Sequence, residues 1–241
     1  MASVKEHYDN LLAPLYSWIS GGFKIRLEEN QKFFESHRIC PSRSGLALDL
    51  GAGPGFQSIP LSKSGFKVIA IDLSRDLLAE LNSHAAGLPI VTVEDNLSNF
   101  TRHINPPVEL IVCMGDTITH LTSREKVQFL IEDVNQSLED NGRLILEFRD
   151  LTHELKELDR FIPVQSDSVK IFTCFLEYEK EHVKVHDIVH EKAGERWVTK
   201  KSYYRKLRLS FRWIVACLQK TGFTIGYLDN SDGMITIIAN K

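Results

Sequence analysis

Short runs of apolar residues recur between residues 46 and 148 and alternate with segments of helical spacing. The runs are rich in Val, Ile and Leu, which is typical of strands buried on both faces of a parallel sheet. The clearest helical segment is 122–138, where Thr122 and Glu125 fit a capping box. This alternation predicts a doubly wound α/β fold with helices on both faces. The predicted strands are Leu46–Leu50, Lys67–Asp72, Pro89–Val93, Val108–Met114 and Arg143–Phe148.

Two flanking segments have different patterns. Residues 4–39 carry apolar side chains at helical spacing, which predicts N-terminal helices interrupted at Pro14 and at the Gly21-Gly22 pair. Residues 169–189 are rich in β-branched and aromatic side chains and have no helix caps. They predict antiparallel strands that cover one end of the main sheet.

The C-terminal pattern predicts a helix followed by a hairpin. The helix spans residues 209–220 and ends before Gly222. Two further strands, 224–228 and 234–239, are joined by the turn-forming residues 229–233. The sheet is therefore expected to end in an antiparallel strand.

Composition narrows the possible partners. The 241 residues are 43% hydrophobic and 25% charged, with a net charge of −3, so no field of one sign attracts nucleic acid or a membrane surface. The start of the chain has no basic segment followed by an apolar run, and no stretch is long enough to span a bilayer. The four cysteines are scattered, which indicates reduced thiols in a cytoplasmic protein.

His182, His186 and His190 recur every fourth residue. Their β-branched neighbours favour a strand, in which consecutive histidines would lie about 13 Å apart. One ion cannot reach across that distance, so we expect no metal site.

The first predicted strand leads into the glycine loop Asp49-Leu50-Gly51-Ala52-Gly53-Pro54-Gly55. Glycines allow a tight turn and let a ligand lie against bare main chain at the carboxyl edge of the sheet. The third glycine of a dinucleotide fingerprint would fall at Phe56, so the spacing disfavours a nicotinamide cofactor. Asp49 would also repel phosphates and suits a cationic ligand better. Asp72 ends the second strand, where a carboxylate can accept both hydroxyls of a ribose.

Together these segments resemble the successive motifs of the class I S-adenosylmethionine-dependent methyltransferases. The resemblance implies methyl transfer from the sulfonium of S-adenosylmethionine and release of S-adenosylhomocysteine. It also implies a Rossmann-like sheet of seven strands that is parallel except for the last strand. The matching segments are Leu46–Gly55, Val68–Ser74, Glu94–Leu97, Glu109–Leu121, Leu138–Glu147 and the C-terminal helix and hairpin.

The resemblance assigns cofactor contacts residue by residue. The glycine loop would hold the methionine part, and Asp72 the ribose, with Leu73 against the adenine. Asp95 and Asn96 lie where the family binds the adenine amino group, and Met114 would pack under the sulfonium. Tyr8 and Tyr16 are expected to close over the cofactor. The predicted cofactor-binding residues are Tyr8, Tyr16, Asp49, Gly51, Gly53, Gly55, Asp72, Leu73, Asp95, Asn96 and Met114.

The segment after the fourth strand bears on the methyl acceptor. Nucleic-acid amino methyltransferases carry an Asn/Asp-Pro-Pro-aromatic tetrapeptide there, whereas this chain has Cys113-Met114-Gly115-Asp116-Thr117-Ile118-Thr119-His120-Leu121. That string resembles the small-molecule branch, which includes glycine and sarcosine N-methyltransferases. His120 is the expected proton acceptor for an amine. Arg149 and Arg205 could pair with a substrate carboxylate. Tyr204 is expected to line the acceptor site.

The residues leave several questions open. The acceptor could be an amine, a hydroxyl or a carboxylate, and the chain could be a monomer or a homodimer. A non-catalytic S-adenosylmethionine-binding module and a protein or RNA methyltransferase remain alternatives. The interpretation divides a single domain into an N-terminal helical lid (1–40), a cofactor-binding core (41–150), a substrate-covering insertion (151–205) and a closing helix with hairpin (206–241).

Overall fold

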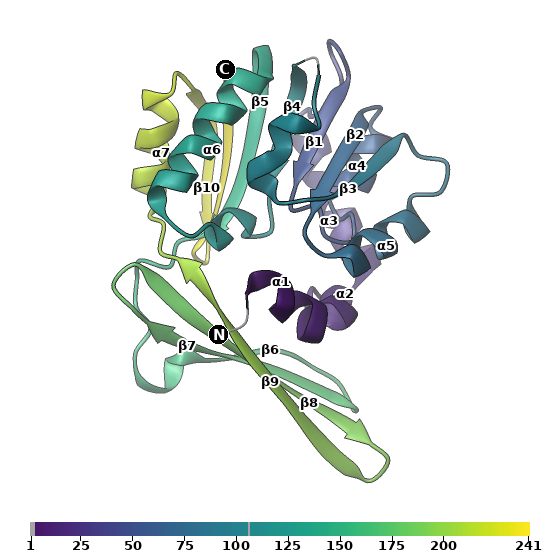
Figure 1. Ribbon diagram of the computed structural model, residues 1–241, viewed down its shortest axis with the longest axis vertical. Coiled ribbons are helices and arrows are strands. Elements are labelled where there is room, and N and C mark those ends of the chain that lie inside the picture. The colour runs from purple at the N-terminus through teal and green to yellow at the C-terminus, as the bar shows by residue number, and fades with distance from the viewer. Residues whose placement is uncertain (1–2, 106) are drawn as a thin grey trace.

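The computed structural model describes residues 3–105 and 107–241 and contains two sheets with the N-terminal helices between them (Figure 1). The larger sheet has seven strands in the order β10-β11-β5-β4-β1-β2-β3. Strand β11 is antiparallel to both neighbours, whereas the other pairs are parallel. The predicted doubly wound sheet is thus confirmed. Its strands are β1 (Leu46–Leu50), β2 (Lys67–Asp72), β3 (Ile90–Glu94), β4 (Val108–Cys113), β5 (Leu138–Arg149), β10 (Thr224–Ser231) and β11 (Met234–Asn240).

Helices cover both faces of this sheet because successive strand side chains point to opposite faces. Leu48 and Leu50 pack in one core with α6 (Arg124–Ser137) and α7 (Phe211–Lys220). Ala47 and Val112 face the other side, toward α3 (Phe23–Ser36) and α4 (Ser58–Lys63), with α5 (Arg75–His84) beside them. Within the described residues, no helix has both the length and the apolarity needed to cross a membrane. Three short 3-10 turns lie in the loops after β3, β4 and β5: Leu97–Arg102, Thr117–His120 and Glu157–Arg160.

The second sheet is antiparallel and has four strands in chain order. They are β6 (Phe161–Ser166), β7 (Lys170–Tyr178), β8 (His182–Ala193) and β9 (Arg196–Leu207). The predicted cover is present and extends beyond the predicted residues 169–189 at both ends. His182, His186 and His190 lie on β8, as the β-branched pattern predicted, and hydrogen-bond to three separate partners, Thr122, Glu177 and Thr199.

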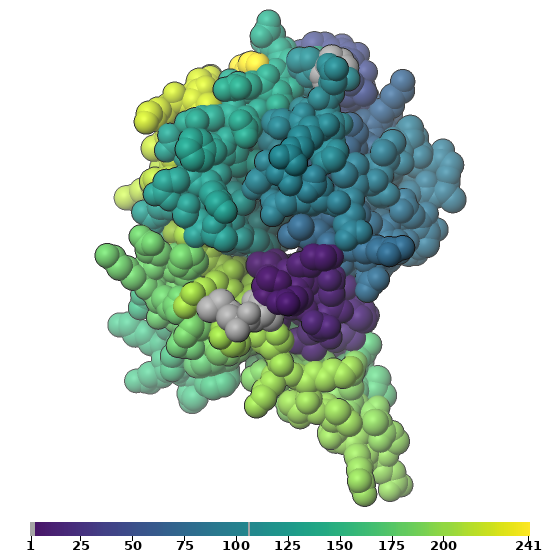
Figure 2. All heavy atoms as spheres, in the orientation of Figure 1, coloured from purple at the N-terminus to yellow at the C-terminus, as the bar shows by residue number. Residues whose placement is uncertain are grey.

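The N-terminal segment packs between the two sheets, as the space-filling view shows (Figure 2). It consists of α1 (Val4–His7), a π turn (Tyr8–Leu12), a 3-10 turn that contains Pro14 (Ala13–Leu15) and α2 (Tyr16–Ile19). Leu11, Leu12 and Leu15 form a core with the apolar face of the small sheet, including Phe172 and Val183. This packing holds the segment over the carboxyl edge of the large sheet.

Two local predictions about the fold were wrong. The N-cap of α6 is Ser123 rather than Thr122, and its hydroxyl accepts from the Lys126 amide. Strand β5 begins at Leu138 and contains the Asn141-Gly142 pair as a bulge instead of starting after it. Asn141 has a φ of 60°, a conformation that asparagine tolerates better than most residues. The first error arises because two adjacent hydroxyl residues, Thr122 and Ser123, can both cap a helix.

Candidate functional site

The glycine loop leaves bare main chain at the end of β1. The amides of Gly51 and Ala52 donate to the carbonyl of Ile71, 2.8 and 3.0 Å away, which ties the loop to the end of β2. Gly51 has a φ of +75°, and a Cβ there would lie 2.3 Å from Cγ2 of Thr117. Only glycine therefore fits, and the loop can approach a ligand without a side chain between them.

Asp72 links this loop to the next helix. One carboxylate oxygen accepts from the Gly53 amide and the other from the Ser74 amide, both at 2.8 Å. Burial raises the pKa of Asp72, and the amide hydrogen bonds oppose that effect. Beside it, the Lys5 ammonium donates to the carbonyl of Leu73 at 2.7 Å. The N-terminal segment is thereby attached to the carboxyl edge of the large sheet.

A cavity adjoins this edge, and we call it the glycine-loop cavity. Its walls come from the N-terminal segment, the glycine loop, the end of β2 and the turns after β3 and β4. The lining residues are Val4, Lys5, Tyr8, Tyr16, Gly51, Gly53, Ile71, Asp72, Leu73, Ser74, Leu77, Asp95, Leu97, Thr117 and His120. The structure thus brings together seven of the eleven predicted cofactor residues.

The other four predicted cofactor residues lie outside the cavity wall. Asp49 is 1% exposed and accepts from the Ser58 hydroxyl at 2.6 Å, so it supports the loop from below. Gly55 faces Leu81, and Met114 belongs to the core beneath the sheet edge. Asn96 accepts from the Ser98 amide at 2.9 Å and caps the following turn. For direct contact with the cofactor, these four predictions find no support in the structure.

Burial has a strong effect on the Asp49 carboxyl group. Desolvation raises its pKa from 3.8 to about 7, against the lowering effect of the Ser58 hydrogen bond. Asp95 behaves in the opposite way, because its hydrogen bond with His103 at 2.7 Å and those with Asn99 and the Asn96 amide lower its pKa to about 2. Asp95 lines the cavity as an anion, and its contact with an adenine stays a prediction.

A second, larger cavity of about 610 Å³ lies between the large sheet, the N-terminal segment and the small sheet. We call it the inter-sheet cavity. One wall carries polar and charged groups from the ends of β4 and β5, and the opposite wall carries apolar side chains of the small sheet. Its lining residues are Tyr8, Leu12, Tyr16, Ile19, Ser20, Arg26, Gly115, Asp116, Glu147, Arg149, Leu151, Ile162, Pro163, Val164, Phe172, Cys174, Leu176, Val185, Asp187, Tyr204, Lys206 and Met234.

Tyr8 and Tyr16 line both cavities. The ring of Tyr16 lies 3.7 Å from the position of a Cβ at Gly53, and its hydroxyl lies 4.0 Å from that of a Cβ at Gly115. It therefore spans from the glycine loop to the turn after β4. Burial raises the pKa of Tyr16 to about 12, so its hydroxyl stays protonated and can donate a hydrogen bond.

His120 lies at the same junction. Its Nε2 is 3.4 Å from the Tyr8 hydroxyl, and its Nδ1 is buried without a hydrogen-bond partner among the described residues. Burial and the nearby Lys206 ammonium lower the pKa of His120 to about 3. The imidazole is therefore neutral and a poor proton acceptor, which argues against the predicted role as base.

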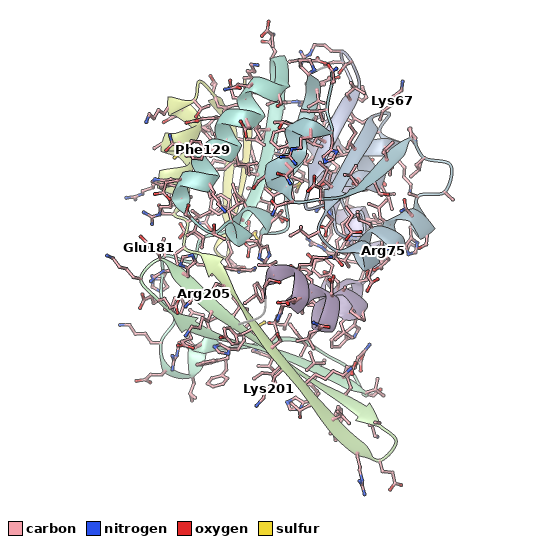
Figure 3. All side chains as sticks on the ribbon, in the orientation of Figure 1. Lys67, Arg75, Phe129, Glu181, Lys201 and Arg205 are labelled. Atoms are coloured by element: carbon pink, nitrogen blue, oxygen red, sulfur yellow. The ribbon has the colours of Figure 1, made fainter. Side chains whose placement is uncertain are left out.

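The three other predicted catalytic residues are placed differently. Arg149 and Tyr204 line the inter-sheet cavity. Arg205 lies on β9 near its C-terminal end (Figure 3) and pairs with Glu179 at 2.8 Å, outside both cavities. Because strand side chains alternate between faces, Tyr204 and Arg205 cannot both face the cavity. The prediction for Arg205 is not supported by this placement.

Sequence reasoning missed several charged residues of the inter-sheet cavity. Lys206 forms an ion pair with Asp116, which also accepts from the Arg149 amide at 2.9 Å. Burial raises the pKa of Asp116, but the Lys206 ammonium outweighs it and leaves that pKa below its ordinary value. Glu147 also lines the cavity. Side chains two positions apart in a strand share a face, so the position of Lys206 two residues after Tyr204 was a signal that could have placed it in the cavity.

His7 and Asp187 form a buried pair between the N-terminal segment and the small sheet. Nε2 of His7 lies 2.8 Å from a carboxylate oxygen of Asp187, and Nδ1 lies 2.8 Å from the Ser202 hydroxyl. The other Asp187 oxygen accepts from the Cys174 thiol at 2.9 Å. No sequence signal indicated this pair, because 180 positions separate its members.

Comparisons with known proteins agree with this geometry. Residues 47–142, which include the glycine loop, Asp72 and His120, match the family of methyltransferase domains. This part of the chain is similar to methyltransferase domains. A curated relative, the glycine/sarcosine N-methyltransferase of Aphanothece halophytica, is 33% identical over 104 residues, which are 42% of this chain and 39% of the relative. The chain therefore matches about two fifths of that relative's length.

Solved structures resemble a larger part of the fold. DesVI of Streptomyces venezuelae has a TM-score of 0.74 at 15% identity, with 95% of this chain and 96% of that chain covered. CalS10 of Micromonospora echinaspora, an amino pentose methyltransferase with S-adenosylmethionine bound, has a TM-score of 0.73 at 12% identity, with 89% and 91% covered. At these identities the likeness shows the fold. The predicted fold is confirmed, and the match of residues 47–142 to methyltransferase domains agrees with the predicted family.

Proposed function

We propose that this protein transfers the methyl group of S-adenosylmethionine to a nitrogen atom of a small molecule. The observation that carries the proposal is the junction of the glycine-loop cavity with the inter-sheet cavity at Tyr8 and Tyr16. A donor in one cavity and an acceptor in the other would meet there. The curated relative is named an N-methyltransferase, and one solved relative an amino pentose methyltransferase, which favours nitrogen over oxygen as the acceptor atom.

The residues of the glycine-loop cavity suit S-adenosylmethionine. The bare main chain at Gly51 and Gly53 forms a cradle that a Cβ at Gly51 would obstruct, and Asp72 and Asp95 present carboxylates for a cationic nucleoside. When bound, the cofactor supplies a methyl group on a sulfonium, which a neutral nucleophile attacks in line. Tyr8 and Tyr16 would exclude water and align the two reactants, so proximity supplies much of the rate.

Binding and turnover together test this proposal. Calorimetry should detect S-adenosylmethionine and S-adenosylhomocysteine and should not detect NAD. A panel of small amines, alcohols and carboxylates should release S-adenosylhomocysteine only with amines. Binding without turnover on any acceptor would favour the alternative of a non-catalytic module. Binding of NAD alone would contradict the proposed cofactor site.

Asp72→Ala should weaken S-adenosylhomocysteine binding by about 1.5–3 kcal/mol, the size expected for hydrogen bonds to a charged group. The matched control is Asp76→Ala, which removes an exposed carboxylate from the first turn of α5. Calorimetry of both variants measures the difference, and thermal unfolding checks that Asp72→Ala is folded. An unchanged affinity for Asp72→Ala would mean that the ribose lies elsewhere.

Two parts of the interpretation stay predictions. The first is the assignment of residues 1–40 as a lid and 151–205 as the substrate-covering insertion. The second is a cytoplasmic location, for which the four free cysteines within the described chain are the supporting feature.

A further inference from the structure

The carboxylates of the inter-sheet cavity differ in how fully their oxygens are paired. Asp116 forms an ion pair with Lys206. Asp187 hydrogen-bonds to His7 and to the Cys174 thiol. The Glu147 carboxylate forms no ion pair within the described residues, and its one hydrogen bond there joins Oε1 to the Gly115 amide at 3.2 Å. The second oxygen of Glu147 is therefore available to a ligand.

Glu147 lies close to the junction of the two cavities. The Gly115 amide that donates to it belongs to the turn after β4, and the Tyr16 hydroxyl lies 4.0 Å from the position of a Cβ at Gly115. Tyr16 in turn borders the glycine loop at Gly53. A group held by Glu147 would thus lie at the end of the inter-sheet cavity that faces the methyl donor.

We propose that Glu147 binds the amino group of the methyl acceptor as an ammonium ion and accepts its proton before methyl transfer. This inference rests on the proposed function. In the first step, one N–H bond of the ammonium breaks and the proton moves to the Glu147 carboxylate, which leaves a neutral amine. The nitrogen lone pair then forms the N–CH₃ bond while the C–S bond breaks, and the sulfur keeps that electron pair. Glu147 returns its proton to water.

The electrostatic surroundings of Glu147 suit this step. Burial raises its pKa, and the Gly115 amide lowers it. Arg26 from α3 and Arg149 from its own strand lower the pKa further, whereas Asp116 raises it. A carboxylate with a raised pKa is a stronger proton acceptor than an ordinary one. Burial lowers the pKa of His120 to about 3, which makes it a poorer proton acceptor for this step.

The size and lining of the rest of the inter-sheet cavity indicate which acceptor molecules would fit. A volume of about 610 Å³ lies within the range of about 300–1,000 Å³ that is typical of sites for drug-sized ligands. The wall opposite Glu147 presents Phe172, Leu176 and Val185 from the small sheet. The acceptor class is therefore an amine with a bulky, partly apolar body rather than glycine or sarcosine.

The first experiment compares acceptors on the wild-type protein. It measures S-adenosylhomocysteine release with glycine, sarcosine, bulky primary and secondary amines, and the alcohols of the same skeletons. The inference predicts turnover of the bulky amines at least about tenfold faster, in kcat/KM, than glycine or the alcohols. Faster turnover of alcohols, or of glycine, would overturn it and leave the methyltransferase activity standing. No turnover on any acceptor would count against the proposed function as well.

The second experiment uses Glu147→Gln, which keeps the shape and removes the charge. We expect kcat/KM for the best amine to fall at least about a hundredfold. In the wild type, kcat/KM should fall as the pH decreases through the pKa of Glu147, and this acidic limb should be absent in the variant. The matched control is Glu139→Gln on the same strand, whose carboxylate pairs with Arg43 far from the cavity. It should behave like the wild type.

Binding of S-adenosylhomocysteine separates a role toward the acceptor from a structural one. Both variants should bind it within about twofold of the wild type. If Glu147→Gln lost this binding, the side chain would support the fold or the cofactor site and the inference would be wrong. An unchanged acidic limb in Glu147→Gln would also overturn it.

Discussion

At Asp49, burial and hydrogen bonding act in opposite directions on one carboxyl group, and burial dominates. The side chain lies beneath the glycine loop and accepts from Ser58, which fixes the point where β1 turns toward α4. This residue resembles a cofactor ligand in the sequence, yet its position is that of a support. The ionisation of Asp49 should therefore change the free energy of unfolding of the ligand-free protein with pH.

The folded protein holds the Asp49 proton more tightly than the unfolded chain, because the pKa rises from 3.8 to about 7 on folding. The free energy of unfolding should consequently fall as the pH rises from about 4 to about 7. Asp49→Asn removes this contribution. Between pH 4 and pH 8, the free energy of unfolding of the variant should therefore fall by about 2–4 kcal/mol less than that of the wild type. Urea unfolding of both proteins at each pH measures the difference. If the free energies of unfolding of both proteins fell equally with pH, the pKa of Asp49 would not be raised in the folded protein.

Strand β9 carries both predicted acceptor residues, Tyr204 and Arg205, and places their side chains on opposite faces. It pairs with β8 along its whole length, and its side chains alternate between the cavity and the outer face of the small sheet. Tyr204 and Lys206 line the inter-sheet cavity. Tyr203 stacks on His186, and Arg205 pairs with Glu179. Neighbouring residues in this strand should therefore affect different properties.

Tyr204→Ala should reduce kcat/KM for the acceptor by at least about tenfold, because it removes a wall of the cavity next to His120. Arg205→Ala is the control and should leave turnover within about twofold, since exposed ion pairs contribute little. Both variants should bind S-adenosylhomocysteine nearly as the wild type does. Steady-state kinetics and calorimetry provide the measurements. The opposite pattern, with Arg205 essential and Tyr204 dispensable, would refute this orientation of β9.

At the scale of the whole molecule, the N-terminal segment joins the two sheets. Lys5 donates to the Leu73 carbonyl on the large sheet, and His7 contacts Asp187 on the small sheet. Tyr8 follows these contacts in the chain and Tyr16 begins α2, and both tyrosines border both cavities. Any change that releases the segment should therefore affect cofactor and acceptor together.

His7→Ala should destabilise the protein by about 3–5 kcal/mol, because it leaves one oxygen of the buried Asp187 carboxylate without its partner. It should also weaken binding of both S-adenosylhomocysteine and the acceptor, and amide hydrogens of residues 4–19 should exchange faster. Asp9→Asn, which breaks only the surface pair with Lys5, is the control and should change neither. Slow exchange and normal binding in His7→Ala would rule out this coupling.

The sequence by itself determined the features that depend on neighbouring residues. Apolar runs interrupted by helical periods predicted the parallel strands, and turn residues predicted the final hairpin. Glycine spacing and the acid at the end of β2 predicted the edge that borders the glycine-loop cavity, because a tight turn and a strand end are local properties. For the same reason, Gly51, Gly53 and Asp72 line the glycine-loop cavity as predicted.

Only the tertiary structure decided which polar groups are paired and which are available. Asp116 meets Lys206 across 90 positions and His7 meets Asp187 across 180, so nothing local distinguishes these carboxylates from Glu147. Burial likewise makes His120 a weak base and moves the Asp49 pKa, since desolvation depends on packing around a group rather than on its neighbours in the chain. The orientation of Arg205 followed from the register of β9 against β8. Long-range packing thus selects the chemistry within a fold that local patterns predict.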